Sequence, residues 1–304
     1  MAVVLVAGGT GFIGSHIVRR LAARGHRVIV LSRSPAAAGA PAGVEVRRGD
    51  VRDAASLRPA MTGVDAVVAT VQFPNHPVEN ARRGHTYMAV DAEGTERLVA
   101  AAKAVGVKRF VYLSGAGTRP GQTAPWFLAK LRAEKVVSET EIPFTIFRPS
   151  WVYGPTDRTL NRFVAFARYL PFIPVLGNGK TRVQPVFVND LAEAVALSLE
   201  MPRAANQVYE MGGPQTLTMD EIIGTMLRVM GMRKPLIHHP AWFMKLVTAP
   251  LTVLPAPPLS PKAVDFVLME EPVDNTALLR DFGLTLTPLG QGLSYLREPH
   301  SDKR

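Results

Sequence analysis

The sequence contains no cysteine, and its 7 histidines show no spacing typical of metal ligands. The absence of cysteine excludes disulfides, thiolate catalysis and cysteine-ligated zinc. His238 and His239 are adjacent, whereas zinc-binding histidine pairs are typically separated by about three to five residues. We therefore expect no metal site.

Apolar runs long enough for a membrane span are also lacking. The segment MAVVLVAGGTGFIG, residues 1–14, breaks at glycines and has no basic stretch before its apolar residues, which indicates a buried strand rather than a secretion signal. The segment AWFMKLVTAPLTVLPAPPL, residues 241–259, is interrupted by Lys245 and by prolines. We expect a soluble, cytoplasmic protein, with peripheral attachment to a membrane as a second possibility.

Acidic residues are scarce in the first half of the chain. Residues 1–150 carry 20 Lys and Arg against 11 Asp and Glu, whereas residues 151–304 carry 15 against 14, for a net charge of +10. This is either a solvated basic surface or a surface that attracts an anion, such as a phosphorylated cofactor or an anionic lipid. No basic run is interleaved with aromatic residues, so we expect no nucleic-acid partner.

The first half alternates two apolar patterns. Short runs of Val, Ile, Leu and Phe, typical of strands buried on both faces, alternate with segments whose apolar residues recur every three or four positions. The expected strands are 2–8, 26–33, 44–50, 64–71, 108–115 and 143–150, and the expected helices are 13–25, 56–63, 94–106 and 126–140. This alternation predicts an α/β fold with a doubly wound parallel sheet of the Rossmann type.

A glycine-rich stretch follows the first expected strand. Gly8, Gly11 and Gly14 have G-x-x-G-x-x-G spacing at the start of the first helix. In this context the glycines permit a tight turn, the approach of a pyrophosphate, and close packing of helix on strand. The phosphate oxygens are then expected near the backbone N–H groups of Gly11, Phe12 and Ile13.

The end of the second strand bears on which dinucleotide is bound. It reads VIVLSRSP, with Ser32 and Arg33 and no acidic residue. A carboxylate there accepts from the ribose of NAD, whereas an arginine suits the 2′-phosphate of NADP, so we expect NADP(H) rather than NAD(H), unless Arg33 only faces solvent. Asp50 is expected either to accept from the adenine amino group or to serve as a turn or helix-cap residue.

After Pro149 the content of proline, glycine and aromatic residues rises. A chain of 304 residues is long for one core. We expect a dinucleotide-binding domain at 1–150, joined by a returning segment at about 183–200, and a smaller α/β substrate or lid lobe at 151–304.

Several motifs together resemble the extended and atypical branch of the short-chain dehydrogenase/reductase superfamily, which is similar to NAD-dependent epimerases and dehydratases. Within it the chain looks most like relatives of the nucleotide-binding accessory subunit of respiratory complex I. The resemblance runs from residue 2 to about 200 and rests on AGGTGFIG, LSR, RRGD, DAEGTERLVAAAKAVGVKRFVYLSG, LAKLRAE, TIFRPSWVYGP and VFVNDLAEAV.

The resemblance implies roles for individual residues. Ser114 matches the catalytic serine or threonine of the family, and Lys130 matches the lysine of its Tyr-x-x-x-Lys motif. The positions implied to bind the dinucleotide are Gly8, Thr10, Gly11, Phe12, Ile13, Gly14, Ser32, Arg33, Asp50, Val51, Ala69, Thr70, Lys130, Pro149, Ser150, Trp151 and Val152.

The tyrosine of that motif is absent, and Trp126 stands in its place. An indole cannot ionise usefully, and general acid–base catalysis contributes roughly 10²–10⁴ in rate. Lys130 can still hold the nicotinamide ribose. The candidate proton donors in place of the missing phenol are Tyr153, Tyr87, His85, Ser114, a water molecule, or Lys130 itself.

We therefore expect an NADP(H)-binding oxidoreductase whose substrate, if it has one, is an apolar or isoprenoid-like small molecule. Residues 236–259 are rich in Trp, Phe, Met, Leu and Pro, and they are expected to form a lid or substrate wall, or else a docking surface for a membrane or protein partner. A non-catalytic assembly or redox-sensor protein is the second hypothesis. A sugar-nucleotide epimerase or dehydratase is less favoured, because its chemistry needs the missing tyrosine.

Overall fold

The computed structural model describes residues 1–34, 43–74, 76–250, 261–270 and 272–297. The chain forms two compact units. The first contains Met1–Pro149, Val188–Met211 and Asp274–Leu284, and the second contains the described parts of Ser150–Phe187, Gly212–Val273 and Thr285–Arg304. Residues 274–284 thus lie in the first unit, although they were expected in the second lobe.

A seven-stranded parallel sheet forms the centre of the first unit, with the order β11-β6-β5-β4-β1-β2-β3. The α/β prediction is confirmed, and each of the six expected strands contains one observed strand. The strands are β1 (Val3–Ala7), β2 (Arg27–Ser32), β3 (Glu45–Arg48), β4 (Ala66–Ala69), β5 (Arg109–Leu113), β6 (Phe144–Pro149) and β11 (Gln207–Met211).

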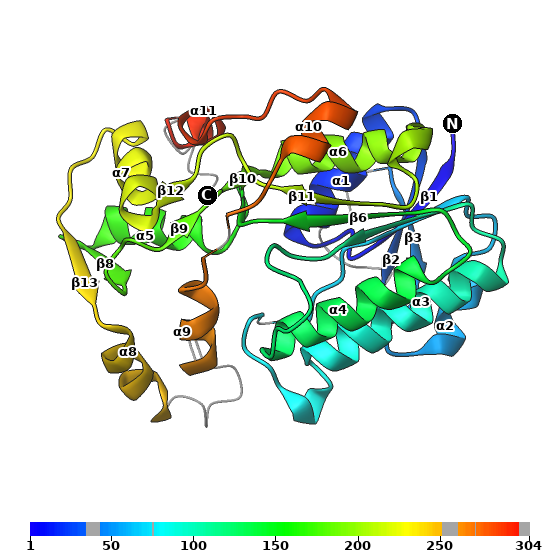
Figure 1. Cartoon of the computed structure of the whole chain (residues 1–304), viewed down its shortest axis with the longest axis horizontal. Coiled ribbons are helices and arrows are strands. Elements are labelled where there is room, and N and C mark those ends of the chain that lie inside the picture. Colours follow the sequence, from blue (N-terminus) through cyan, green and yellow to red (C-terminus); the bar gives the residue numbers. More distant parts are fainter. Residues whose placement is uncertain (35–42, 75, 251–260, 271, 298–304) are drawn as a thin grey trace. The chain divides into compact units, whose positions relative to one another are not determined.

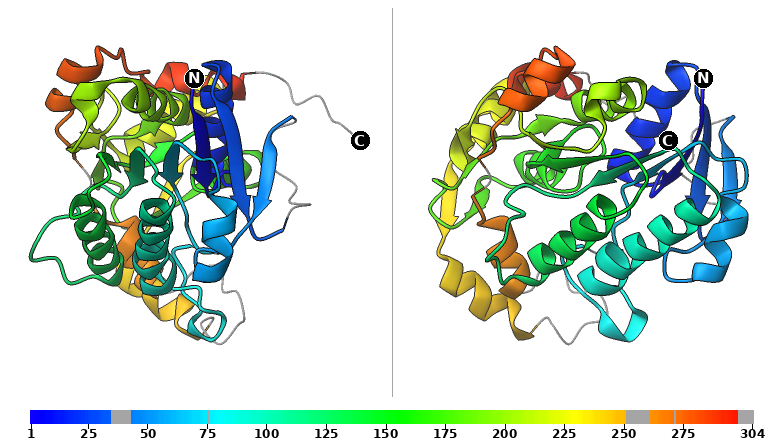
Figure 2. Two further views of the ribbon diagram at one scale, coloured as in Figure 1. Left: turned by 90° about the vertical axis from the view of Figure 1, so that its right-hand side faces the viewer. Right: turned by 45° about the vertical axis from the view of Figure 1, so that its right-hand side comes forward.

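Helices cover both faces of this sheet, as the views of Figures 1 and 2 show. On one face lie α2 (Ala54–Ala60), α3 (Glu93–Ala104) and α4 (Pro125–Ser138), and on the other lie α1 (Phe12–Ala23) and α6 (Val188–Glu200). The helix α10 (Thr276–Phe282) packs beside β11. Because both faces are covered, strand residues such as Leu5, Val67 and Phe110 are fully buried.

The returning segment differs from the prediction in one respect. Its helix, α6, does join the first unit, but the strand before it, β10 (Val186–Phe187), pairs with β7 (Val152–Tyr153) in the second unit. The seventh strand of the large sheet is instead β11, which follows α6 and pairs with β6. The residues before α6 therefore do not extend the large sheet.

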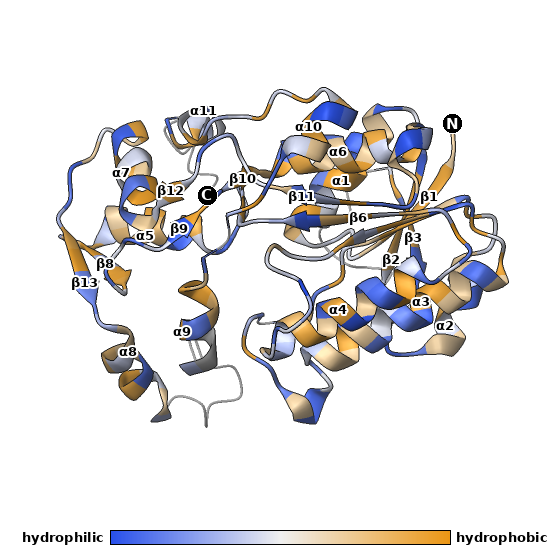
Figure 3. Cartoon of the chain, viewed as in Figure 1, coloured by the Kyte–Doolittle hydropathy of each residue, from blue (hydrophilic) through white to orange (hydrophobic). Residues whose placement is uncertain are grey.

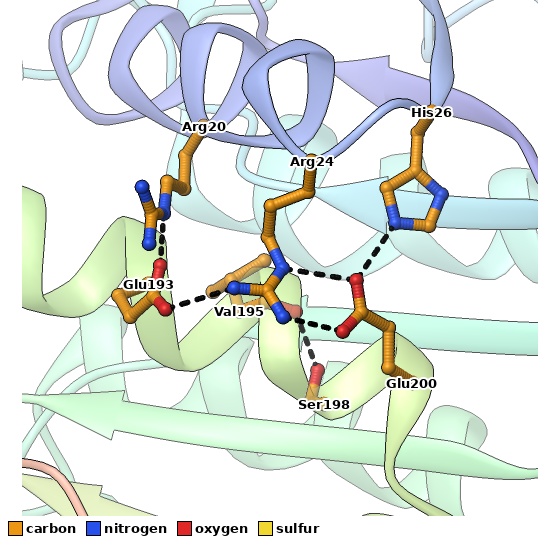
Figure 4. Close-up of polar contacts among 7 residues, drawn as sticks. All are labelled: Arg20, Arg24, His26, Glu193, Val195, Ser198 and Glu200. Carbon is orange, nitrogen blue, oxygen red and sulfur yellow. Dashed lines mark hydrogen bonds and ion pairs between the residues drawn. The ribbon is translucent and has the colours of Figure 1, made fainter. Parts of the chain in front are cut away.

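An ion-pair network ties α6 to α1, which are close neighbours in the first unit (Figure 4). Arg20 contacts Glu193, and Arg24 contacts both Glu193 at 3.1 Å and Glu200 at 2.5 Å. His26, just after the helix, lies 3.2 Å from Glu200. The network joins segments about 170 positions apart in the sequence.

The second unit is built from shorter elements around its own core, which includes Tyr153, Ile223 and Leu293. Its pairs of strands are β7 with β10, β8 (Ile173–Leu176) with β13 (Leu236–His239), and β9 (Arg182–Val183) with β12 (Leu217–Thr218). Its helices are α5 (Leu160–Tyr169), α7 (Met219–Val229), α8 (Ala241–Thr248), α9 (Pro261–Val267) and α11 (Leu289–Gly292). Among the helices that the structure describes, none has the length and apolarity needed to cross a bilayer.

Candidate functional site

The glycine-rich turn connects β1 to α1. Gly8 has a φ of +88°, which favours glycine, and its carbonyl oxygen accepts from the Gly11 N–H at 2.9 Å. A Cβ on Gly8 would lie 2.5 Å from the carbonyl oxygen of Thr70, and one on Gly14 would lie 2.8 Å from the carbonyl carbon of Gly8. The turn can therefore close only with bare α-carbons at these positions.

The same turn leaves the start of α1 suited to an anion. Gly11 is the N-cap and supplies no side-chain cap, and the first turn of the helix has no acidic residue. The first N–H groups of a helix lack intrahelical partners and favour negative charge. Thr10, Phe12 and Ile13 surround this end and are half-buried. These residues fit a bound pyrophosphate.

The end of β2 carries no carboxylate. Ser32 donates its hydroxyl to the Ser34 carbonyl oxygen at 2.8 Å, and Arg33 is exposed. The Asp50 carboxylate accepts from Arg52, at 2.7 Å from the guanidinium and 2.9 Å from the backbone N–H. Burial opposes ionisation of Asp50, but the bonds from Arg52 outweigh it and hold the pKa of this carboxyl below its usual range. Asp50 thus makes the turn contact that was one of its two expected roles.

Three further predicted residues lie at or just after the carboxyl ends of β3 and β4. Val51 is buried and packs against α3, where a Cβ on Gly94 would meet it at 2.9 Å. Ala69 ends β4 in the core, and the Thr70 N–H donates to the Ala7 carbonyl oxygen at 2.9 Å. Thr70 and Gly8 therefore lie side by side at the carboxyl ends of neighbouring strands.

Ser114 follows β5 and is buried. Its N–H donates to the Phe147 carbonyl oxygen at 2.8 Å, and its hydroxyl lies 3.4 Å from that of Thr118. Pro149 ends β6 nearby, because its carbonyl oxygen accepts from the Ala116 N–H at 2.9 Å. The structure thus brings the loop after Ser114 together with Pro149.

Ser150, Trp151 and Val152 belong to the second unit. The Ser150 hydroxyl accepts from the Gln184 N–H at 3.4 Å, and the Trp151 carbonyl oxygen accepts from the Val186 N–H at 2.9 Å. These bonds hold the start of this unit beside its strand β10.

Lys130 lies on α4 with its ammonium 2.8 Å from the carboxylate of Asp91 and 3.2 Å from the Leu113 carbonyl oxygen. The ammonium also lies 5.2 Å from the centre of the Tyr112 ring. Burial lowers the pKa of Lys130, but attraction to Asp91 and Tyr112 outweighs it and raises this pKa above its ordinary value. Burial raises the pKa of Tyr112 to about 12. Lys130 therefore remains protonated at neutral pH.

Trp126 lies one helical turn before Lys130 and packs against the core of the first unit. Its ring centre is 6.2 Å from that of Tyr87, which in turn lies 5.4 Å from that of His76. Burial raises the pKa of Tyr87. Burial, with a smaller contribution from the Lys130 charge, lowers the pKa of His76 to about 3, so this imidazole is neutral at neutral pH.

Tyr153 and His85, both candidate proton donors, lie in different surroundings. Tyr153 is fully buried in the core of the second unit, with its ring centre 5.6 Å from that of Phe187. His85 lies in a backbone bridge with Asn80 in the first unit. Burial lowers the pKa of His85, and the charge of Arg52 adds to this effect.

Asp91, Tyr112 and His76 were not predicted as site residues. Asp91 stands in the π-helix η2 (Tyr87–Ala92), within the largely apolar run YMAVDA, and is 1% exposed. A buried carboxylate needs a cationic partner. An aspartate within an apolar run was therefore the feature of the sequence that could have identified Asp91 as a site residue. No comparable feature of the sequence identifies Tyr112 and His76, because aromatic residues in strands and loops are usually packing residues.

The glycine turn, the helix start and the parallel sheet define a class of protein, namely α/β proteins that bind a dinucleotide at the carboxyl edge of the sheet. Residues 4–212 match the model of the NAD dependent epimerase/dehydratase family. The chain belongs to this family, and it therefore has the dinucleotide-binding fold of NAD(P)-dependent oxidoreductases.

Similar proteins include both a respiratory-complex subunit and a reductase. The chain is 28% identical over 257 residues to the mitochondrial NADH dehydrogenase [ubiquinone] 1 alpha subcomplex subunit 9 of Arabidopsis thaliana, covering 82% of this chain and 63% of that protein. It is 29% identical to the 2-alkyl-3-oxoalkanoate reductase of Stenotrophomonas maltophilia, covering 75% of this chain and 76% of that protein.

Solved structures share the fold. The UDP-glucose 4-epimerase of Thermus thermophilus in complex with NAD superposes with a TM-score of 0.74 at 22% identity, covering 97% of this chain and 99% of that chain.

Proposed function

We propose that this protein binds NADP(H) in preference to NAD(H) and acts as an oxidoreductase on an apolar small molecule. The observation that carries the proposal is the bare-glycine turn, since the β2 end beside it offers Arg33 and no carboxylate. A guanidinium presents a rigid fork of donors that suits a phosphate. The cytoplasm is the proposed location.

The residues implied by the family define the proposed site. The N–H groups at the start of α1 bind the pyrophosphate, Arg33 binds the 2′-phosphate, and the β4 end lines the adenosine. Ser114, Lys130 and Pro149, all in the first unit, hold the nicotinamide end. When bound, the dinucleotide supplies the hydride, whereas the chain binds and orients it.

The cofactor preference can be tested by equilibrium binding of NADPH and NADH to the full chain. We expect Arg33→Ala to weaken the binding of NADPH by about tenfold or more, because charge-assisted hydrogen bonds contribute about 1.5–3 kcal/mol. The affinity for NADH should not change. Arg27→Ala at the opposite end of β2, where Arg27 pairs with Glu45, is the matched control and should change neither affinity. An unchanged NADPH/NADH ratio in Arg33→Ala would refute the proposed preference.

The reductase among the similar proteins supports a small carbonyl compound or a related apolar acceptor as the substrate class. Exposed apolar side chains of the second unit, such as Trp242 and Leu246, support an apolar substrate. NADPH absorbance should fall when the protein is mixed with a suitable member of a panel of quinones, enals and ketones.

A second candidate is a non-catalytic assembly or redox-sensor protein that binds the dinucleotide. Trp126 favours it, because the indole lacks the acid–base chemistry of a phenol. The complex I subunit among the similar proteins also supports it. Stabilisation by NADPH without turnover across the panel would select this candidate over the enzyme. A sugar-nucleotide epimerase or dehydratase is the least favoured candidate, because its chemistry needs the tyrosine that Trp126 replaces.

The segment 236–259 is the proposed partner or substrate surface, and residues 251–259 lie outside the described residues. Within the described part, α8 exposes Trp242 at 68% and Leu246 at 66%, and Figure 3 shows this helix to be largely hydrophobic. An exposed apolar helix face suits a membrane or a protein partner. Trp242→Ser/Leu246→Ser should reduce sedimentation with anionic vesicles if a membrane is the partner. Equal sedimentation of both proteins would contradict that assignment.

A further inference from the structure

The ion pair between Asp91 and Lys130 is held inside the first unit. Asp91 is 1% exposed, and the Lys130 side chain is 16% exposed. An ammonium has three N–H donors, and here one bonds the carboxylate at 2.8 Å and another the Leu113 carbonyl oxygen at 3.2 Å. The position of the ammonium is therefore set by fixed acceptors on η2 and β5, and one donor is left for a ligand or for the neighbouring Tyr112.

The pair also sets the charge of this region. An isolated buried ammonium loses its proton readily, because burial disfavours the charged form. Attraction to Asp91 keeps the pKa of Lys130 above its ordinary value. Burial raises the pKa of Asp91, and the ammonium opposes that rise. At neutral pH the two groups together carry no net charge, and Lys130 is a poor proton donor.

The net charge of the Asp91–Lys130 pair matters because the oxidised and reduced forms of the cofactor differ by one elementary charge at the nicotinamide ring. The oxidised ring is cationic and the reduced ring is neutral. An uncompensated ammonium beside the ring would weaken binding of the oxidised form, whereas a compensated one leaves the two forms closer in affinity. The Asp91 carboxylate supplies that compensation.

We propose that Asp91 is a positioning residue that neutralises Lys130 and thereby sets the relative affinity of the site for oxidised and reduced dinucleotide. This inference rests on the proposed function, in which Lys130 holds the nicotinamide ribose. The ratio of the two affinities can be measured without turnover, and so the inference applies to the enzyme and to the redox sensor alike.

The test measures the dissociation constants of NADP⁺ and NADPH with the full chain at pH 6.5, by titration calorimetry. We expect Asp91→Asn to raise the ratio of the NADP⁺ to the NADPH dissociation constant by about fivefold to tenfold, as expected for one charge at about 10 Å in a partly screened site. The double variant Asp91→Asn/Lys130→Met, which is again neutral, should restore the wild-type ratio although both affinities fall.

The pH dependence provides a readout that a purely structural role would not change. In Asp91→Asn the raised ratio should decline between about pH 6.5 and pH 9, because the ammonium without its carboxylate deprotonates more easily. Asp91, Tyr112 and His76 are the titratable groups that interact with Lys130. In the wild-type protein the contact with Asp91 keeps the pKa of Lys130 above its ordinary value, so the ammonium stays charged over this range. The wild-type ratio should therefore stay constant.

A matched control removes a different buried ion pair from the same helix. Glu134 on α4 contacts Arg148 at 2.6 Å and is buried. Glu134→Gln should leave the ratio unchanged, whatever it does to stability. Lys130→Met alone, tested in case Asp91→Asn fails to fold, should leave the ratio unchanged or lower it, because no ammonium then opposes the oxidised ring.

The outcomes separate this inference from the proposed function. If Asp91→Asn weakens both forms equally, or if Lys130→Met raises the ratio, Asp91 does not set the redox preference, although the site still binds dinucleotide. If the wild-type protein binds neither NADP⁺ nor NADPH, the proposed function itself is wrong and the inference falls with it.

Discussion

At the scale of single residues, the glycines and Lys130 differ in how far the sequence determines their surroundings. A bare α-carbon is demanded by the local turn, so the spacing of Gly8, Gly11 and Gly14 was sufficient to predict a tight loop at the start of α1. A long lysine side chain can reach many partners. The contact of Lys130 with Asp91, 39 positions earlier, depends on how η2 packs against α4.

Replacement of Gly14 tests the close approach in the glycine turn. We expect Gly14→Ala to destabilise the protein by about 1–3 kcal/mol, because the added methyl group overlaps the Gly8 backbone, and to abolish most dinucleotide binding. Urea denaturation and NADPH titration measure the two effects. Gly224→Ala in α7 is the control, since its nearest neighbour would be the Arg228 guanidinium at an ordinary 3.7 Å. Wild-type affinity in Gly14→Ala would contradict the proposed binding turn.

Trp126 offers a test of the missing phenol. We expect Trp126→Tyr to keep NADPH affinity within about twofold and to raise the rate of NADPH oxidation on the acceptor panel, by up to roughly 10²–10⁴ if the rest of the pocket is competent. Trp126→Phe supplies an aromatic ring of similar size to tyrosine without a hydroxyl and should give no increase. Equal rates for the two variants would show that the hydroxyl does not act as the acid.

At the scale of elements, the helices of the first half were recognisable from their periodicity, whereas their partners were not. α1 was expected at 13–25 and observed at Phe12–Ala23. Its neighbour α6 was expected in the same unit. The ion pairs between the two helices could not be predicted, because the strand order decides which helices lie next to each other. For the same reason β11 was missed, since its residues QVYEM carry no strong strand pattern of their own.

Glu200 should make the α1–α6 contact sensitive to acid. Its bonds with Arg24 lower its pKa to about 2, from an ordinary value of about 4.3 in an unfolded chain. The contribution to stability is therefore present above about pH 4.3 and is lost as the pH falls towards 2. We expect Glu200→Gln to lower the free energy of unfolding at pH 7 by about 0.5–1 kcal/mol, because solvent screens this partly exposed pair.

The pH profile of that difference is the measurement. Urea denaturation at several pH values should show the wild-type and Glu200→Gln proteins converging as the pH falls below about 4.3. Glu139→Gln removes an exposed helical pair with Lys135, 3.8 Å apart, and should cause little change at any pH. A Glu200→Gln effect that persists undiminished at low pH would contradict the assignment to the ionised carboxylate.

At the scale of the whole molecule, the chain divides between two units that each draw on several separate segments. The change of composition after Pro149 marks the first passage from one unit to the other. The return of residues 274–284 is not visible in the composition, because α10 is short and its role comes from packing on β11 through Phe282 and Tyr209. Ring centres of these two residues lie 5.0 Å apart.

Cofactor binding should therefore stabilise the first unit selectively. At a free NADPH concentration of 100 times its dissociation constant, we expect a gain of about 2.7 kcal/mol in the stability of this unit. Hydrogen exchange should slow in β1, β2 and the first turn of α1, and change little in α7 of the second unit. Protection confined to the second unit would contradict the proposed location of the dinucleotide.

The sequence by itself determined the parallel sheet, the glycine turn, the family and the absence of a carboxylate after β2, because each depends on residues close together in the chain. Only the tertiary structure decided the partners of Lys130, the neighbours of Trp126, the place of β11 and the division of the later segments between the units. These features depend on which surfaces meet after the strands have paired, and packing of that kind couples residues that no local pattern connects.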